Sequence, residues 1–273
     1  MIVSLAEVLQ DALKNRYAVA GLVCLGWEDM RAYARAAEAE GVPVILQAGP
    51  GCRAHTPIPV LAAMMRSVAE SVSVPVVVHL DHSRDLEECR TAIEAGFTGV
   101  MYDGSRLPLE ENIRCTSEVV RMAHAAGISV EGEIGFVGYA AGESSAGTDP
   151  EEARRFAIET GVDAMAISIG NVHLQTDSQT DLDEDLLARI EAATEVPLVI
   201  HGGTGVPVPQ RVALARGSAI CKYNIGTELR QAFGRDLRQV LAEHPHRFDR
   251  IEIFADLEGR IVSSTRELLR ALQ

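Results

Sequence analysis

The chain alternates short, β-branched apolar runs with longer amphipathic segments from one end to the other. A short, continuously apolar run is typical of a strand buried on both faces, and apolar positions at helical spacing predict helices. Eight strands are predicted, at Ala18–Cys24, Pro43–Gln47, Pro75–Leu80, Gly99–Asp103, Ile128–Glu133, Ala164–Ile169, Pro197–His201 and Ala219–Asn224. Helices are predicted between them, at Glu28–Glu40, Ile58–Ser71, Leu86–Ala95, Pro108–Ala126, Pro150–Thr160, Asp183–Thr194 and Val208–Arg216.

A strand that returns to its neighbour through a helix runs parallel to it, so these repeated units predict a parallel sheet. Eight units favour a closed (β/α)8 TIM barrel of the α/β class over an open sheet. Helical patterns at Glu228–Ala242 and from Thr265 to the end predict a C-terminal helical extension. No Ser-, Pro- or Gly-rich linker divides residues 1–273, so we expect a single domain. The longest irregular stretch, Gly135–Asp149, is long enough to suggest a functional loop.

Charge and cysteine content narrow the classes of function. The net charge of −14 argues against a nucleic-acid partner and against an anionic membrane, although a pocket can still be locally positive. The five cysteines are scattered and form no CxxC pair, which indicates free thiols in a reducing compartment. The N-terminus lacks a signal-peptide pattern and no apolar run reaches membrane-spanning length. We therefore expect a cytoplasmic protein.

Three histidines, His82, His173 and His201, stand at or just past the ends of separate predicted strands. The C-terminal ends of barrel strands converge, and three imidazoles with an open position are typical of a catalytic zinc site. One such histidine alone would more often be an inert, hydrogen-bonded residue, but three at corresponding positions favour the metal. Asp81 precedes His82, and local chemistry leaves two roles open for it: acid/base catalysis or orientation of a ligand histidine.

Two polar turns follow the last two predicted strands. Gly202-Gly203-Thr204-Gly205 comes directly after His201, and Asn224-Ile225-Gly226-Thr227 ends the eighth strand. Loops after the seventh and eighth strands of barrel enzymes often bind phosphate through backbone N–H groups and a helix N-terminus. The sequence therefore predicts a phosphorylated small molecule as substrate.

With these features the chain resembles a known family, the class II (metal-dependent) ketose-bisphosphate aldolases, which include fructose- and tagatose-bisphosphate aldolases. The resemblance extends from about Leu5 to Phe233. Six ordered motifs carry it: His79-Leu80-Asp81-His82, Met101-Tyr102-Asp103-Gly104-Ser105-Arg106-Leu107-Pro108, Val130-Glu131-Gly132-Glu133-Ile134-Gly135, Ile169-Gly170-Asn171-Val172-His173, His201-Gly202-Gly203-Thr204-Gly205 and Cys221-Lys222-Tyr223-Asn224-Ile225-Gly226-Thr227.

The resemblance implies a lyase with one Zn²⁺ bound by His82, His173 and His201, and Glu133 near the metal as an alternate ligand. It implies that Asp81 is the acid/base that acts on the hydroxyl group at the cleaved bond. It also implies that Glu143 of the long loop moves the proton on the enediolate carbon, although the spacing between Glu133 and Glu143 is slightly shifted from that of the family. The phosphate ligands it implies are Gly202, Gly203, Thr204, Asn224 and Thr227. A monovalent cation as an optional second ion, and a homodimer or homotetramer, also follow from it.

The implied reaction is reversible retro-aldol cleavage of a phosphorylated ketose into a dihydroxyacetone-phosphate-like ketone and an aldehyde. Zinc would polarise the ketone and replace a Schiff-base lysine, which fits a chain whose only lysines are Lys14 and Lys222. The chain departs from the family at Val23, Gly26 and Gly49, where polar side chains are usual, so we expect a substrate other than fructose 1,6-bisphosphate. Two alternatives remain: a metal-dependent epimerase or isomerase working through an enediolate, and a catalytically weak sugar-phosphate-binding homologue.

Overall fold

A computed structural model describes residues 1–177 and 179–273 of the chain. Eight parallel strands close into a barrel in the order β1-β10-β9-β7-β5-β4-β3-β2. Their bounds are β1 (Val19–Val23), β2 (Val44–Ala48), β3 (Val76–Ser83), β4 (Gly99–Tyr102), β5 (Ser129–Ile134), β7 (Ala164–Ile167), β9 (Leu198–Ile200) and β10 (Ile220–Ile225). The predicted TIM barrel is therefore confirmed, with each strand inside or close to its predicted range.

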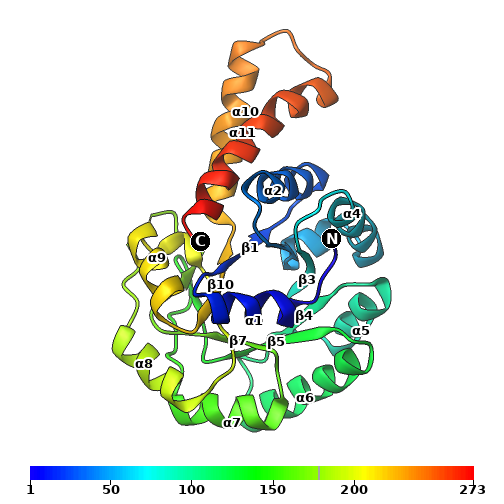
Figure 1. Ribbon diagram of the computed structural model, residues 1–273. Helices are drawn as coiled ribbons and strands as arrows, with labels where there is room; N and C mark the ends of the chain where they lie inside the picture. The colour runs from blue at the N-terminus through cyan, green and yellow to red at the C-terminus, as the bar shows by residue number, and fades with distance from the viewer. Residues whose placement is uncertain (178) are drawn as a thin grey trace.

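A ring of helices covers the outside of the barrel (Figure 1). The ring comprises α2 (Trp27–Glu40), α4 (Ile58–Glu70), α5 (Leu86–Ala95), α6 (Leu109–Ala125), α7 (Pro150–Thr160), α8 (Glu184–Ala193) and α9 (Val208–Gly217). Each helix presents an apolar face to the outward side of the strands, which is why the strands are apolar on both faces. All seven helices were predicted from the apolar spacing.

A helix outside this ring, α1 (Leu5–Asn15), closes the N-terminal end of the barrel and was not predicted. The Ser4 side chain caps it by accepting a hydrogen bond from the backbone N–H of Glu7 (3.2 Å). Its buried face packs with the inward-pointing residues at the start of the strands, including Val19, Ile45 and Val77. Figure 1 shows the helix lying across this end of the barrel. The N-terminal end of the barrel is therefore covered, and the loops that follow the strands lie at the opposite, C-terminal end.

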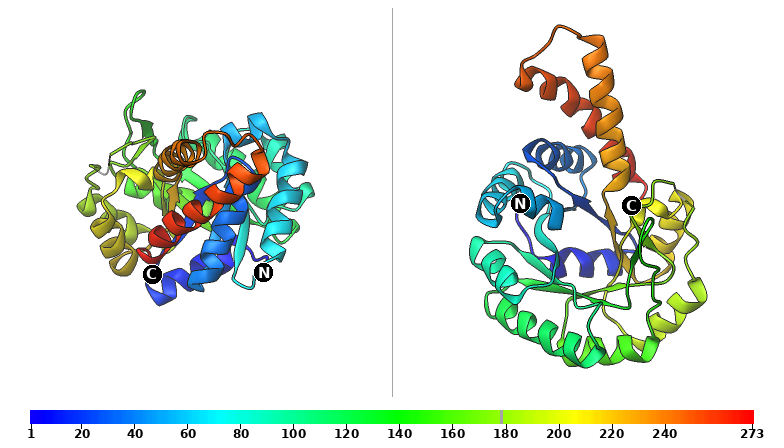
Figure 2. Two further views of the ribbon diagram at one scale, coloured as in Figure 1. Left: turned by 90° about the horizontal axis from the view of Figure 1, so that it is seen from above. Right: turned by 180° about the vertical axis from the view of Figure 1, so that it is seen from behind.

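The chain ends in two antiparallel helices, α10 (Thr227–Glu243) and α11 (Arg250–Arg270), that project from the barrel as an arm (Figures 1 and 2). The prediction that the last helix starts at Thr265 was wrong, because the Asp249 carboxylate caps a helix start by accepting from the N–H groups of Ile251 and Glu252. α11 packs along α2, and Glu258 pairs with Arg31 at 2.6 Å. Between the two helices, the side chain of Phe248 is 93% exposed.

The segments above the C-terminal end of the barrel are more ordered than the sequence suggested. A short helix, α3 (Pro50–His55), follows β2, and the long loop contains β6 (Gly138–Tyr139), which pairs in parallel with β8 (Val172–His173). The expectation that residues 135–149 lack regular structure is thus corrected. Two-residue strands escape prediction because their pairing depends on contacts between distant parts of the chain.

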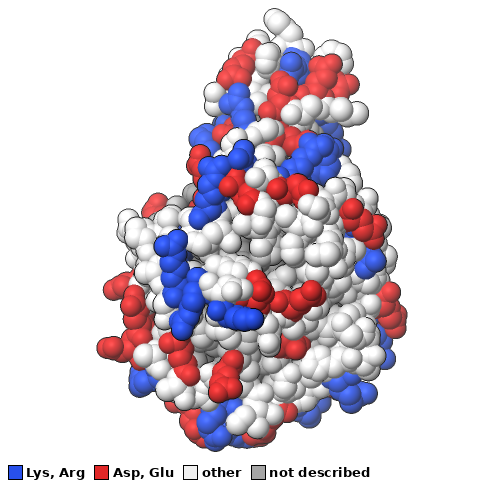
Figure 3. All heavy atoms as spheres, in the orientation of Figure 1, with Lys and Arg blue, Asp and Glu red and all other residues white. Residues whose placement is uncertain are grey.

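The surface carries both signs of charge. Acidic and basic side chains are interspersed over the arm and the barrel on the face shown in Figure 3. In the part of the chain that the structure describes, no helix combines the length and apolar character needed to cross a bilayer.

Candidate active site

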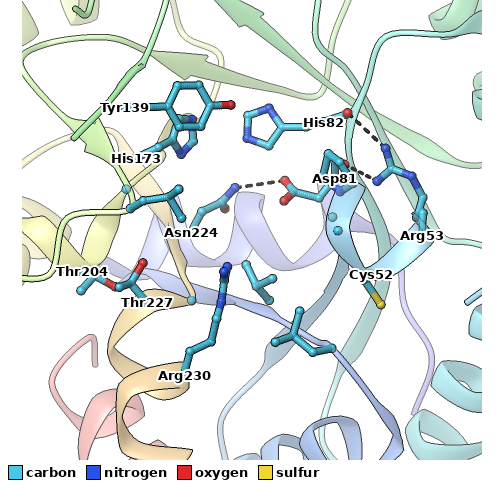
Figure 4. A pocket seen from close by; sticks show the side chains of 18 of the residues that line it. Cys52, Arg53, Asp81, His82, Tyr139, His173, Thr204, Asn224, Thr227 and Arg230 are labelled. Carbon is cyan, nitrogen blue, oxygen red and sulfur yellow. Dashed lines mark hydrogen bonds between the residues drawn. The ribbon is translucent and has the colours of Figure 1, made fainter. Parts of the chain in front are cut away.

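A cavity of about 610 Å³ lies at the C-terminal end of the barrel. Its lining comes from the strand ends and from the loops that follow them, and it includes Asp81, His82, His173 and Asn224 (Figure 4). Its volume falls within the usual range for small-molecule sites. The cavity therefore gathers polar residues that the sequence had placed on different strands.

The three predicted metal histidines come together beside this cavity. The imidazole centroid of His82 lies 4.5 Å from that of His201 and 5.0 Å from that of His173, and the latter two rings are 5.6 Å apart. One ring nitrogen of each residue lies within 4.8 Å of the others, close enough for one divalent cation to contact all three. His82 belongs to β3 and His173 to β8, while His201 directly follows β9.

Buried polar atoms without a partner support a cation at this position. The Nε2 atom of His201 lies 3.0 Å from Oε1 of Glu131, so a proton on Nε2 leaves Nδ1 as a lone-pair donor. Among the described residues, that Nδ1 atom and Oε2 of Glu133 are buried and have no hydrogen-bond partner. Burying such groups is costly unless something binds them, and a cation at this position would bind the lone pair of Nδ1 and offset negative charge on Glu133.

The pKa values of the histidines reflect their surroundings. Burial, followed by the neighbouring His82 and His201, lowers the pKa of His173 to about 2. Burial and His82 also lower the pKa of His201. For His82, burial works in the opposite direction, but Asp81 and Asp103 prevail and raise the pKa to about 9. The imidazoles of His173 and His201 are therefore neutral, which is the form that binds metal. The imidazole of His82 lies beside the negative charges of Asp81 and Asp103.

Two acidic side chains that do not line the cavity, those of Asp103 and Glu133, adjoin the imidazoles. Asp103 lies 3.2 Å from Nδ1 of His82 and also pairs with Arg84, and Oε2 of Glu133 lies 3.5 Å from Nδ1 of His201. Burial and the charge of Asp103 raise the pKa of Glu133 to about 8. His82, Asp103 and Glu133 form a second group able to hold a cation. Sequence analysis placed Asp103 at a strand end but assigned it no role.

Asp81 lies within the cavity and is oriented by Asn224, whose Nδ2 donates to Oδ1 of Asp81 at 3.2 Å (Figure 4). Burial alone would raise the pKa of this carboxyl group, but the charges of His82 and Lys222 lower it. Asp81 is thus ionised at neutral pH, in the form that can accept a proton. Asn224, predicted only as a phosphate ligand, also contacts this carboxylate.

Four of the five predicted phosphate ligands line the cavity: Gly202, Thr204, Asn224 and Thr227. Gly202 has a φ of 67°, and a Cβ atom there would lie 2.1 Å from the carbonyl oxygen of Val172, so only glycine fits. The fifth residue, Gly203, packs against the backbone of Asn224 and does not line the cavity. α10 begins at Thr227, so its N-terminus faces the same space.

Glu143 lies outside the cavity, on the rim of the barrel. It forms an ion pair with Arg106, and its side chain is 60% exposed. Tyr139 of the same loop does line the cavity, and its ring lies 5.1 Å from that of His173. No sequence pattern singled out Tyr139.

Two further basic residues distinguish this site. Lys222 is fully buried inside the barrel, where its Nζ atom lies 2.5 Å from Oε2 of Glu131, and it does not line the cavity. Arg230 of α10, which sequence analysis missed, points into the cavity (Figure 4). Among the described residues, no carboxylate lies close enough to form an ion pair with Arg230. The cavity therefore contains a cationic group available to an anion.

Comparison with known proteins identifies relatives across the whole chain. A sequence profile described as fructose-bisphosphate aldolase class-II matches residues 3–273. A fructose-bisphosphate aldolase from Geobacillus stearothermophilus is 36% identical over 97% of this chain and 96% of its own length. A 6-phospho-5-dehydro-2-deoxy-D-gluconate aldolase from Shouchella clausii is 39% identical over 90% of this chain and 86% of its own. The crystal structure of the YdjI aldolase from Escherichia coli K12 superposes with a TM-score of 0.85 at 30% identity, covering 100% of this chain and 97% of its own.

Proposed function

The chain belongs to the class-II fructose-bisphosphate aldolase family, whose members are lyases, and on that premise we propose that it cleaves a phosphorylated ketose by a zinc-dependent retro-aldol reaction. One observation carries the proposal. At the cavity, three imidazoles able to share a cation lie near the ionised carboxylate of Asp81 and a phosphate-type helix N-terminus. Asp81 and His82 come from β3, His173 from β8 and His201 from the end of β9, and the helix N-terminus follows β10, so the closed barrel brings them together.

His82, His173 and His201 would hold the zinc ion. When bound there, zinc supplies positive charge that stabilises the negative charge developing on the substrate's carbonyl oxygen. Lys222 is held by Glu131 away from the cavity, so a Schiff base with this lysine is not expected. Treatment with borohydride in the presence of substrate should therefore leave activity intact.

Asp81 removes the proton from the hydroxyl group on the aldehyde side of the bond that breaks. The carbon–carbon bond electrons then pass toward the ketone side, the oxygen that lost its proton becomes the aldehyde carbonyl, and an enediolate remains. Asn224 keeps the Asp81 carboxylate in place, since its Nδ2 atom donates to Oδ1. A proton delivered to the enediolate carbon completes the ketone, and Glu143 is the proposed carrier. Its loop must then move, because Glu143 pairs with Arg106 outside the cavity.

The substrate carries anionic groups at two positions. Gly202, Thr204 and the N-terminus of α10 would bind the phosphate of the ketone half. Arg230 would bind an anionic group on the aldehyde half, because its guanidinium faces the cavity without a carboxylate partner in the described chain. The wall near β1 and β2 is formed by Val23, Leu25 and Gly49, which offer few hydrogen bonds to a polyhydroxylated chain. We therefore propose a ketose phosphate other than fructose 1,6-bisphosphate.

The exposed apolar end of the arm supports a homo-oligomer, as a dimer or tetramer. Phe248 and Ile251 are 93% and 80% exposed at the turn between α10 and α11. All five cysteines are free thiols, which supports a reducing, cytoplasmic location.

The test is a screen of phosphorylated ketoses in the cleavage direction with zinc-loaded protein. Two carbon fragments support an aldolase, whereas a single isomeric product would show an epimerase or isomerase. A chelator should abolish turnover and added Zn²⁺ should restore it. Full activity in a metal-stripped sample would rule out the mechanism. Binding of ketose phosphates without any product would show a binding protein.

A further inference from the structure

Strand β3 is irregular at the point where it delivers Asp81 and His82. It pairs with β4 through Leu80 and Val100 and then through Ser83 and Tyr102, so two residues of β3 face one residue of β4. His82 adopts a φ of 52°, a left-handed conformation that a residue with a side chain rarely adopts. Pairing with β2 has already ended at Leu80. The carbonyl groups of the bulge therefore need hydrogen-bond donors from outside the sheet.

Arg53 of α3 supplies these partners. Its Nη1 atom donates to the carbonyl oxygens of Asp81 and Ala48, both at 2.5 Å, and its Nη2 atom donates to that of His82 at 3.2 Å. The two bonds to the bulge are drawn in Figure 4. Only 7% of the Arg53 side chain is exposed, although the residue lines the cavity.

Glu88 of α5 occupies the remaining donors of the same guanidinium. Its carboxylate accepts from Nε at 2.8 Å and from Nη2 at 3.0 Å, and it also accepts from the hydroxyl of Ser83 at 2.6 Å. All five N–H groups of Arg53 thus have acceptors. Arg53 differs in this respect from Arg230, which faces the same cavity with no carboxylate partner in the described chain. A substrate anion would have to break an existing contact to reach Arg53.

We propose that Arg53 is a positioning residue for the reaction. Held by Glu88, it fixes the strained bulge of β3 so that the Asp81 carboxylate and the His82 imidazole keep a constant separation. This inference rests on the function proposed above, in which Asp81 moves the proton and His82 binds the metal. An unusual backbone conformation persists only where its surroundings enforce it. The Arg53 guanidinium does so here, because it is hydrogen-bonded to the carbonyl groups of Asp81 and His82, which precede and follow the Cα atom of His82.

Lysine cannot replace arginine in this role. A lysine ammonium carries the same charge, but it lacks the planar fork that reaches three carbonyl groups and a carboxylate together. The variants to compare are therefore Arg53→Lys, Arg53→Met and Glu88→Gln. Arg66→Met is the matched control, because Arg66 also donates to a backbone carbonyl, that of Gly96 at 3.0 Å, and pairs with Glu70 on the outside of the barrel.

The first readout is the separation of kcat from KM in zinc-loaded protein. We expect kcat to fall about 10²-fold in Arg53→Met, because a displacement of about 1 Å can cost that much. The decrease in log kcat in Arg53→Lys should be more than half of that in Arg53→Met. The kcat of Glu88→Gln should lie between those of wild type and Arg53→Met. KM should change by less than about threefold, since Arg53 has no donor left for substrate. Arg66→Met should keep the wild-type kcat.

The second readout is the metal site itself, with Co²⁺ as the probe. Displacement of His82 should alter the visible Co²⁺ absorption spectrum and weaken Zn²⁺ affinity by about tenfold, measured by chelator competition. A folded Arg53→Met protein with wild-type kcat and an unchanged Co²⁺ spectrum would overturn the proposal. So would a rise in KM alone, which would make Arg53 a substrate ligand. If Arg53→Met does not fold, wild-type values in Glu88→Gln overturn it equally.

Failure of the proposed function would look different. In that case wild-type protein cleaves no ketose phosphate, while the Co²⁺ spectra of the Arg53 and Arg66 variants still decide whether Arg53 positions His82.

Discussion

Two regions border the same cavity and hold their side chains in different ways. At the strand ends, Asp81 and His201 are buried and fixed by Asn224 and Glu131. In the loop at residues 135–149, Glu143 is largely exposed and pairs with Arg106 away from the cavity. The strand ends thus present a preassembled set of groups, whereas Glu143 would have to move to carry out the proton transfer proposed for it. The comparison suggests that binding and charge stabilisation are built into the barrel and that one proton transfer depends on the loop.

Among the changes at the strand ends, Asp81→Asn should reduce activity most. It keeps the shape of the side chain and its position beside Asn224 but removes the proton acceptor. We expect kcat to fall about 10³-fold while substrate and zinc still bind, measured by steady-state kinetics and calorimetry. Asp149→Asn, at the start of α7, is the control because asparagine also caps helices, and it should keep activity. Retained turnover in Asp81→Asn would move the acid/base role elsewhere.

The loop side is tested by Glu143→Gln, for which we expect a loss of about 10²-fold in kcat with little change in zinc affinity. Glu110→Gln is the matched control, since Glu110 also pairs with a partly exposed arginine, Arg155, but does not line the cavity. Arg106→Met should change kcat by less than about fivefold, because an exposed ion pair contributes little to the position of a loop.

If Glu143→Gln leaves kcat at the wild-type value, the proton on the enediolate carbon comes from another group. Deuterium exchange at that carbon, followed by NMR with the ketone product, separates this step from bond cleavage. Exchange that is lost while cleavage persists would assign the step to Glu143. Both rates unchanged would remove Glu143 from the mechanism.

For the histidines at the strand ends, we predict that zinc affinity depends on pH. The pKa of His82 lies above its usual value, at about 9, so in metal-free protein this imidazole is protonated at neutral pH and zinc must displace the proton. Apparent zinc affinity should therefore rise as pH increases toward that pKa, by about tenfold per pH unit for one proton. Chelator competition at several pH values measures the slope.

A slope near two protons would indicate that Glu133, with a pKa of about 8, also loses its proton and becomes a ligand. An affinity that does not change with pH would contradict the environment described for His82. Calorimetry in two buffers of different ionisation enthalpy counts the same protons independently.

A change in the apolar wall of the cavity should alter substrate choice only weakly. Val23→Asn returns a polar side chain to the wall of the cavity near β1 and should raise kcat/KM for fructose 1,6-bisphosphate by less than about tenfold. Val60→Asn, on the exposed side of α4, is the control and should leave kcat/KM unchanged. Efficient turnover of fructose 1,6-bisphosphate by wild-type protein would show that the apolar wall does not exclude it.

The same division explains what could be predicted from the sequence. Strands and helices of the barrel were predictable because each apolar pattern is local, and the family was recognisable because its motifs lie at strand ends. α1 and the early start of α11 were not predicted from apolar spacing, although Ser4 and Asp249, which cap these helices, are local signals in the sequence. The places of Arg53 and Tyr139 at the cavity could not be predicted, because they depend on contacts between segments distant in the chain.

The proposed mechanism requires that three imidazoles from three parts of the barrel bind one cation. X-ray absorption at the zinc K-edge of the protein loaded with one equivalent of Zn²⁺ reports on that coordination. We predict a shell of imidazole nitrogens at about 2.0–2.1 Å that loses part of its scattering in His201→Ala. A zinc shell without imidazole scattering, or one that His201→Ala leaves unchanged, would contradict the account.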